Sequence, residues 1–233
     1  MNNKKFNLIA GLVESTASTG LPDINPWGDG SQLSYLKFDG SLYDTQRNTN
    51  IGWTGTPCYT RNNPDGSGSA ISAHTNKDTY STSFIPNSLS SSGWSFSFWY
   101  NPNACNVFGS TTASNQWFIA YAPLNLIIGF DYQRVCVGWD RSLYACSDYI
   151  WTSRVYHHVV VQGNSSRLYV YTNGNLTGQT SSMSYSNKGS SRNLFRHWLT
   201  NTPYWPEQGT VSNLRTFTRM LTTDEITQLS QQY

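Results

Sequence analysis

Aromatic and polar residues that lie close together in the sequence are best suited to chemistry here, and that chemistry is sugar binding. A sugar face can stack on an exposed aromatic ring, and its hydroxyls need amide, carboxylate or guanidinium partners. The candidate ligand-binding residues are Trp139, Asp140, Arg141, Tyr144, Tyr204 and Trp205. The group at 139–144 is favoured, because the tip of a hairpin is exposed and held in place. The alternative for any one tryptophan is packing in a core or at a subunit contact.

Catalysis by paired carboxylates is not indicated. A glycosidase needs two carboxyl groups about 5–10 Å apart. The chain has three glutamates, Glu14, Glu207 and Glu225, and no predicted strand carries two acids at alternate positions. The sequence also lacks G-x-S-x-G, H-E-x-x-H and a glycine-rich phosphate loop with lysine. We therefore expect no catalytic residues, with a divergent hydrolase as the remaining enzymatic alternative.

Calcium is the candidate cofactor, and the identity of any metal ligands stays open. Ca²⁺ takes about six to eight oxygen ligands. The acid- and glycine-containing stretches 23–30 and 63–68 could offer them, but neither matches an EF-hand, and plain glycine-rich turns are the alternative. His157 and His158 are adjacent, so on a strand they point to opposite faces and cannot easily bind one ion. We expect structural roles for both.

The chain has four cysteines, whose pairing the sequence leaves open. Cys136 and Cys146 flank nine residues that could form a hairpin. In an oxidising setting the favoured arrangement is Cys136 with Cys146 and Cys58 with Cys105. Four buried free thiols are the alternative.

Two N-glycosylation sequons occur, at Asn164 and Asn175. Both fall at predicted hairpin turns, where a sugar could be accommodated. They matter only if the chain enters a eukaryotic secretory pathway, and sequons also arise by chance in a chain this rich in Ser, Thr and Asn.

Charge and composition exclude several classes of partner. The 15 basic and 13 acidic residues give a net charge of +2, and no basic run exceeds Lys4-Lys5, so we expect no nucleic-acid groove or polybasic membrane patch. No apolar run approaches the length of about 18 residues that suggests a membrane span. A polar, uncharged composition rich in Trp and Tyr is typical of β proteins outside the cytoplasm or on particle surfaces.

We expect strands to position the candidate binding residues. Alternation of apolar and polar residues predicts strands over 35–38, 94–100, 116–121, 126–131, 133–139, 156–162, 167–172 and 210–217. Asn173-Gly174 predicts a type I′ hairpin turn, and residues 181–193 a polar loop. Thr222 and Glu225 form a capping box, which predicts a helix to about Ser230. Together these elements predict an all-β antiparallel sandwich over residues 32–233, preceded by an extended N-terminal arm over residues 1–31.

Four different segments follow one another along the chain in an order that can be compared with known folds. They are residues 36–41 with Phe38-Asp39-Gly40, residues 94–99, residues 151–174 with His157-His158 and Asn173-Gly174, and residues 209–226. In this order they resemble the laminin G-like branch of the concanavalin A-like jelly rolls. The resemblance implies a concanavalin A-like jelly-roll sandwich whose first and last strands pair centrally. It does not imply one function, because this fold hosts lectins, receptor modules, hydrolases and structural domains.

Two functional hypotheses follow. The first is a non-catalytic, lectin-like attachment module that recognises a glycan or glycoprotein on a cell or particle surface. The second is a structural subunit of a virion or an extracellular filament that self-assembles through residues 1–31 and its aromatic loops. Both predict an extracellular or particle-surface location.

Overall fold

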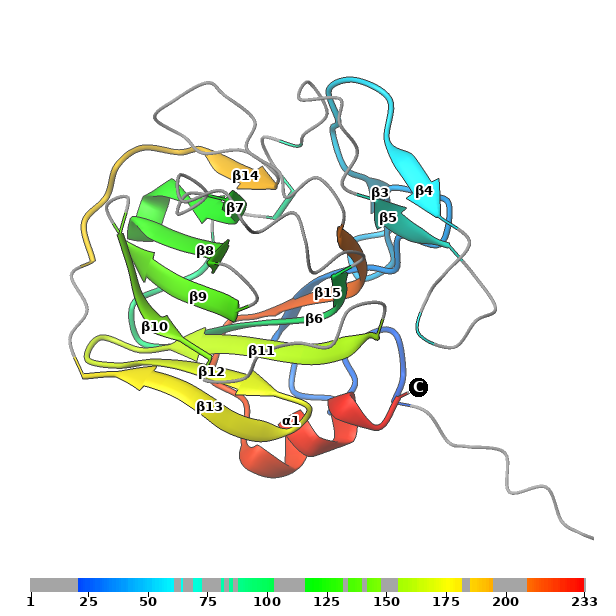
Figure 1. Ribbon diagram of the computed structural model, residues 1–233. Coiled ribbons are helices and arrows are strands. Elements are labelled where there is room, and N and C mark those ends of the chain that lie inside the picture. Colours follow the sequence, from blue (N-terminus) through cyan, green and yellow to red (C-terminus); the bar gives the residue numbers. More distant parts are fainter. Residues whose placement is uncertain are drawn as a thin grey trace, which may run out of the picture.

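The computed structural model describes residues 21–60, 64, 69–72, 81, 84–85, 88–102, 116–131, 134–139, 142–147, 155–181, 185–194 and 209–232. Within these residues two antiparallel sheets form a β-sandwich, and an α-helix follows the last strand (Figure 1). The all-β antiparallel fold predicted from the sequence is therefore confirmed.

The larger sheet has ten strands among the described residues, ordered β13-β12-β11-β6-β15-β1-β2-β3, with β5 beside β15 and β4 beside β5. These strands are β1 (Gln32–Leu36), β2 (Tyr43–Asp44), β3 (Thr49–Asn50), β4 (Cys58–Thr60), β5 (Ala70–Ser72), β6 (Trp94–Pro102), β11 (His157–Gly163), β12 (Leu168–Thr172), β13 (Asn175–Thr180) and β15 (Gly209–Phe217). The smaller sheet has five, ordered β10-β9-β8-β7-β14. These are β7 (Gln116–Tyr121), β8 (Leu126–Asp131), β9 (Arg134–Trp139), β10 (Ser142–Cys146) and β14 (Arg192–Leu194), and the 3₁₀ turn η2 (Ala122–Leu124) links β7 to β8.

The core between the sheets combines aliphatic side chains with aromatic rings. Trp94, Phe96 and Phe98 alternate along β6 and are fully buried, as the alternation predicts. Phe98 meets Phe118 of the smaller sheet in an edge-to-face contact, with ring centroids 4.8 Å apart. This geometry adds aromatic attraction to the burial of both rings and links β6 of the larger sheet to β7 of the smaller one.

Helix α1 (Thr223–Ser230) covers part of the outer face of the larger sheet. Its Ile226 packs with Val160 of β11 and Phe217 of β15. The predicted capping box begins it: the Thr222 hydroxyl accepts the Glu225 N–H at 3.3 Å, and the Glu225 carboxylate accepts the Thr222 N–H at 2.8 Å. Within the described residues no helix is long and apolar enough to cross a membrane.

Residues 21–31 lie on the same outer face and are held there partly by Arg215 of β15. The guanidinium of Arg215 donates to the carbonyl oxygens of Pro22 and Asp23, each at 3.3 Å. The described part of the expected arm therefore contacts its own chain, and residues 1–20 lie outside the described part.

The predicted central pairing of the first and last strands is present as β1 and β15. However, β1 runs from Gln32 to Leu36, two residues short of the predicted end at 38. The reason is Phe38, whose φ of 61° lies in the left-handed region that bulky residues avoid, so the chain leaves the strand before it. The other predicted turn is confirmed, because Asn173 and Gly174 have φ values of 49° and 83°.

Candidate functional site

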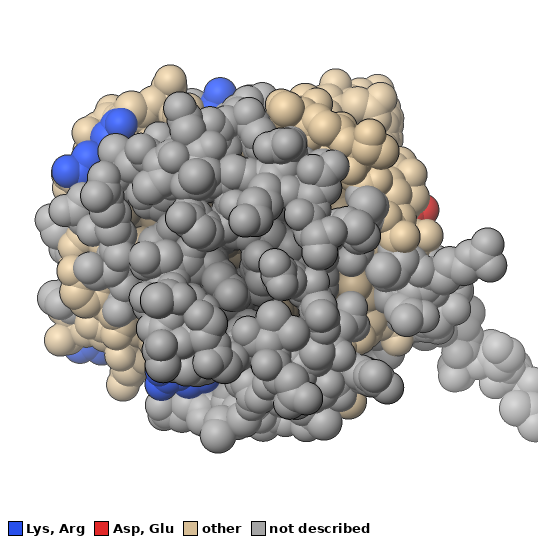
Figure 2. Space-filling view, turned by 45° about the horizontal axis from the view of Figure 1, so that its top comes forward, with Lys and Arg blue, Asp and Glu red and all other residues tan. Residues whose placement is uncertain are grey.

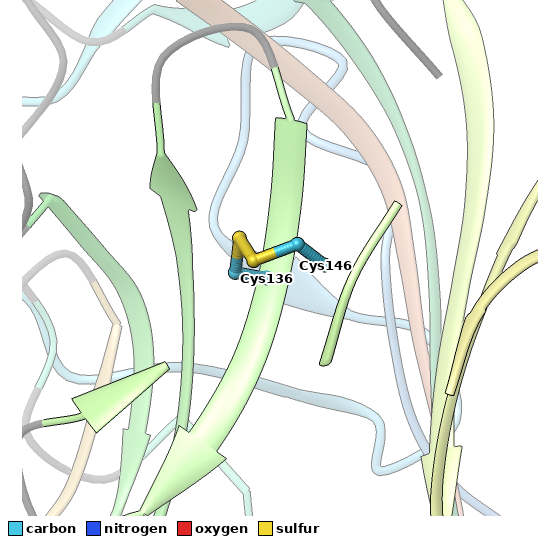
Figure 3. The surroundings of a disulfide bond; sticks show 2 residues. All are labelled: Cys136 and Cys146. Carbon is cyan, nitrogen blue, oxygen red and sulfur yellow. A yellow bond between two sulfur atoms is a disulfide. The ribbon is translucent and has the colours of Figure 1, made fainter. Parts of the chain in front are cut away.

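The favoured group of candidate residues lies on a hairpin formed by β9 and β10, which a disulfide closes (Figure 3). Cys136 and Cys146 are direct partners across the two strands, and their Sγ atoms are bonded. This is the pairing that their spacing favoured. The other favoured pairing, Cys58 with Cys105, involves side chains outside the described part of the chain.

Two candidate residues from this hairpin stack on one another. The rings of Trp139 and Tyr144 have centroids 3.8 Å apart and planes 19° apart. Trp139 is half-buried and packs against the core, whereas Tyr144 is 48% exposed. We call these two residues the aromatic ledge. Trp139 ends β9, close to its predicted place at the end of a strand, and the Tyr144 ring covers one face of its indole.

A β-bulge brings Tyr144 to this position. The ladder between β9 and β10 shifts register between Leu143 and Ala145, so Tyr144 is the extra residue. A bulge of this kind re-aims a side chain and bends its strand. The outer face of Tyr144 is therefore the ring surface that a sugar could reach.

A polar segment, residues 185–191, lies beside the same end of the smaller sheet. Trp139 pairs with Leu126, and the preceding Asn125 donates from Nδ2 to the Ser186 hydroxyl at 3.1 Å. The Lys188 N–H donates to a carbonyl of η2 at 3.0 Å, and the Lys188 side chain is exposed. Sequence reasoning proposed no ligand contacts here, because long-range hydrogen bonds, not a local motif, place this segment beside the end of the smaller sheet.

The other candidate ligand-binding residues cannot be placed. Asp140 and Arg141, at the tip of the hairpin, lie outside the described residues, as do Tyr204 and Trp205. The structure therefore brings together Trp139 and Tyr144 from the six predicted positions.

Carboxylates in the stretch considered for calcium contact cations of the chain itself. Asp23 lies 2.6 Å from Lys37 Nζ, and Asp29 lies 2.6 Å from a guanidinium nitrogen of Arg219. Burial opposes ionisation of Asp29, but hydrogen bonds from Ser31 and Arg219 outweigh burial and hold the Asp29 pKa below its usual value. Across the described residues no three His, Cys, Asp or Glu side chains gather as a metal site would require.

Glu225, the one glutamate among the described residues, is also committed to Arg219. Its carboxylate accepts two guanidinium hydrogen bonds, at 2.6 and 2.8 Å. These bonds are the main reason that the pKa of Glu225 is lowered. Glu225 thus stabilises the start of α1.

The two adjacent histidines occupy separate environments, as strand geometry predicts. His158 is 1% exposed, and its Nε2 lies 2.9 Å from the Ser97 hydroxyl. Burial, helped by the charge of Arg215, lowers the pKa of His158 to about 3, so it is neutral near pH 7. His157 is also buried, with its Nδ1 3.3 Å from the Asn173 amide.

The two sequon asparagines differ in their surroundings. The Asn164 Oδ1 accepts the N–H groups of Ser166 and Arg167, and its Nδ2 points at the Met220 sulfur, 3.4 Å away. Asn175 is exposed at the start of β13. An attached sugar would therefore displace Met220 at the first site but extend into solvent at the second.

Three solved structures have the same fold at low sequence identity. Domain 4 of AbnA, a GH43 extracellular arabinanase from Geobacillus stearothermophilus solved in complex with arabinotriose, matches with a TM-score of 0.61 and 20% identity over 86% of this chain and 98% of that one. The binding domain of Paraclostridial Mosquitocidal Protein 1 matches with a TM-score of 0.68 and 13% identity over 87% and 52%. A structure of botulinum neurotoxin type C, whose cell entry depends on interaction with two ganglioside molecules, matches with a TM-score of 0.59 and 15% identity over 86% and 50%.

This chain thus spans nearly all of the arabinanase domain and about half of each toxin structure. At these identities the likeness shows the fold. No curated protein sequence matches the chain. A family model described as the concanavalin A-like lectin/glucanases superfamily (Laminin_G_3) matches residues 65–227, more than half of the chain. Together with the jelly-roll sandwich, this match confirms the resemblance read from the four sequence segments: the chain belongs to the concanavalin A-like lectin/glucanases superfamily.

Proposed function

We propose that this chain is a non-catalytic, lectin-like module that binds carbohydrate on a cell or particle surface. The observation that carries the proposal is the aromatic ledge, in which Tyr144 is 48% exposed and is supported from below by Trp139. A ring fixed by a stacked partner loses little conformational freedom when a sugar binds, which favours affinity.

Polar groups near the ledge would provide the hydrogen bonds. Asn187 and Lys188 are exposed in the segment that Asn125 anchors beside Trp139. An amide both donates and accepts, and an ammonium donates to hydroxyl or carboxylate oxygens. Figure 2 shows only scattered charged side chains among the described residues of the face it presents. Only 12% of the chain's residues are charged, which favours recognition by stacking and hydrogen bonding over recognition by a charged patch.

The family and its structural relatives support a carbohydrate ligand. One relative was solved with arabinotriose and another interacts with gangliosides. By extension, we propose a glycan or glycoprotein partner and an extracellular or particle-surface location for this chain.

We propose that the chain is not catalytic because several of its described carboxylates are paired with cationic side chains. Among the described residues, Asp23, Asp29 and Glu225 are each paired with Lys37 or Arg219, and Asp44 is buried against Arg47 at 2.6 Å. The pKa values of Asp29 and Glu225 are lowered, and a carboxyl group with a lowered pKa is a poor general acid.

A glycan array tests the proposed function. The full chain is applied with and without Ca²⁺, beside a Tyr144→Ala variant and a Tyr43→Ala control. Tyr43 is 37% exposed on the other sheet, so this control removes a similarly exposed phenol away from the ledge. We expect glycan binding that Tyr144→Ala weakens and Tyr43→Ala preserves. No binding under either calcium condition would refute the proposal.

The alternative is a structural subunit that assembles through residues 1–31 and the aromatic loops. Residues 21–31 contact Arg215 and Arg219 of their own chain. Light scattering of the full chain beside a variant lacking residues 1–20 tests this alternative. Assembly of the full chain alone would support it, and identical monomers would exclude it.

A further inference from the structure

Tyr144 lies on a short strand that pairs with a neighbouring strand on one side, within the smaller sheet. β10 has five residues and is the edge strand of the smaller sheet, where it pairs with β9. The bulge at Tyr144 interrupts even this ladder, since the register shifts between Leu143 and Ala145. A bulge leaves its extra residue out of the ladder, so the direction of the Tyr144 ring depends on how firmly β10 is attached to β9.

The Cys136–Cys146 disulfide provides this attachment (Figure 3). Cys146 lies two residues after Tyr144, and Cys136 lies three residues before Trp139. Cys136 is fully buried in β9, which is itself flanked by β8, so the bridge ties the edge strand to a fixed one. On the other side of the bulge, Ser142 pairs with Trp139. The bulge is therefore confined between a covalent link and a ladder pair.

The larger sheet also contacts the C-terminal end of β10, at Cys146. At Gly178 of β13 the backbone comes so near that an added Cβ would overlap the Cys146 carbonyl oxygen. Glycine permits this close approach because it has no Cβ. Cys146 is thus fixed between Cys136 and Gly178, whereas Tyr144 keeps its exposed position.

We propose that the Cys136–Cys146 disulfide is the positioning element of the aromatic ledge. With the bond formed, the bulge keeps Tyr144 stacked on Trp139. With the bond reduced, β10 changes register or frays, and the two rings separate while the sandwich stays folded. The consequence for sugar binding rests on the function proposed above, but the stack is a property of the ligand-free protein.

Reduction would proceed by thiol–disulfide exchange with a dithiol. A thiolate of the reductant attacks Cys146 Sγ, because Cys146 is half-buried and Cys136 is fully buried. The Cys136 sulfur leaves as a thiolate and takes a proton. The second reductant thiolate then displaces Cys146, which also takes a proton. Two electrons pass to the cystine, and the reductant becomes a disulfide.

Hydroxyl-radical footprinting with mass spectrometry tests this proposal without a ligand. The full chain is oxidised by radicals before and after treatment with dithiothreitol, and the rates of Trp139 and Tyr144 are compared. We expect the Trp139 rate to rise about two- to threefold on reduction, because its covered face becomes accessible. Trp94, which is fully buried in the core, should keep its rate.

Two variants separate positioning from stability. The double variant Cys136→Ala with Cys146→Ala should show the faster Trp139 rate without reductant. Ile128→Val removes one methyl group from the core beside Val137 and leaves the disulfide intact. This control should lower stability and leave the Trp139 rate unchanged. If the disulfide acted only by stabilising the fold, Ile128→Val and the double cysteine variant should change the Trp139 rate alike.

Unchanged rates of Trp139 and Tyr144 after reduction would overturn the proposal. A parallel rise at Trp94 would also overturn it, because the disulfide would then stabilise the whole fold. The proposed function is judged separately, on the oxidised protein. If the ledge opens on reduction but the oxidised chain binds neither arabinotriose nor the glycans of an array, the positioning role stands and the proposed function fails.

Discussion

The Tyr144 ring lies on the Trp139 ring at a centroid distance of 3.8 Å, although the two residues come from different strands and differ in burial. Trp139 packs against the core, whereas Tyr144 is 48% exposed. The supporting ring and the accessible ring of the ledge are thus different residues. This division separates stability from binding, and the two can be measured independently.

Trp139→Ala is expected to destabilise the protein more than Tyr144→Ala. Truncating the half-buried indole removes core contacts and should lower the free energy of unfolding by about 2–3 kcal/mol. Truncating the exposed phenol should cost only about 0.5 kcal/mol. Urea denaturation of both variants and the wild type measures the difference. Equal losses would contradict the assigned division between a supporting and an accessible ring.

His158 should make the fold sensitive to acid. Its pKa is lowered from 6.5 to about 3, so below about pH 6.5 the unfolded chain binds a proton that the folded chain does not. This contribution to stability is complete above pH 6.5 and is lost as the pH falls toward about 3. Between about pH 7 and about pH 5 it should lower the free energy of unfolding by about 2 kcal/mol.

A His158→Gln variant isolates that contribution. The carboxylates are the same in both proteins, so the difference between their pH dependences reports His158 alone. Urea titrations at the two pH values should show a loss in the variant that is smaller by about 2 kcal/mol. Identical losses would show that His158 does not set the acid limit.

Arg215 should hold residues 21–31 on the sheet. Its guanidinium makes three hydrogen bonds, including one to Gln32 at 2.8 Å, and lies 3.8 Å from the centre of the Tyr35 ring. Arg215→Ala should lower the free energy of unfolding by about 3 kcal/mol, because the buried Gln32 side chain and two part-buried carbonyl oxygens lose a charged donor. Hydrogen exchange in residues 21–31 should become faster.

Arg167→Ala serves as the matched control, because Arg167 is exposed in the turn between β11 and β12. Its effect should stay within about 0.5 kcal/mol. If both variants left the exchange of residues 21–31 unchanged, the proposed role of Arg215 would be wrong.

Asn175 should be glycosylated in preference to Asn164 when the chain passes through a eukaryotic secretory pathway. Asn175 is exposed, whereas the Asn164 amide nitrogen faces Met220 at 3.4 Å. Intact-mass analysis should find one glycan on the secreted wild type and on Asn164→Gln, and none on Asn175→Gln. A glycan that persists in Asn175→Gln would reverse this preference.

Local signals in the sequence were sufficient for much of the fold. The turn at Asn173-Gly174 and the capping box at Thr222 depend on a few adjacent residues, and both are present as predicted. The alternation along β6 placed Trp94, Phe96 and Phe98 in the core. Such features are predictable because their geometry follows from neighbouring residues alone.

Features that depend on distant contacts could not be predicted. Nothing in the local sequence marks Tyr144 as a bulge residue, so its stacking on Trp139 was not foreseen. The end of β1 before Phe38 follows from a backbone conformation that phenylalanine rarely adopts. The segment around Lys188 lies against η2 through hydrogen bonds to residues that are far away in the sequence.

The most direct test of carbohydrate binding by the ledge is calorimetric titration with the strongest glycan from the array. The titration compares the wild type, Tyr144→Ala and Tyr43→Ala at matched folded concentration. Loss of one stacking contact of about 1 kcal/mol should raise the Kd of Tyr144→Ala about fivefold, while Tyr43→Ala should match the wild type. Equal Kd values for all three proteins would show that the glycan binds elsewhere and would contradict the account.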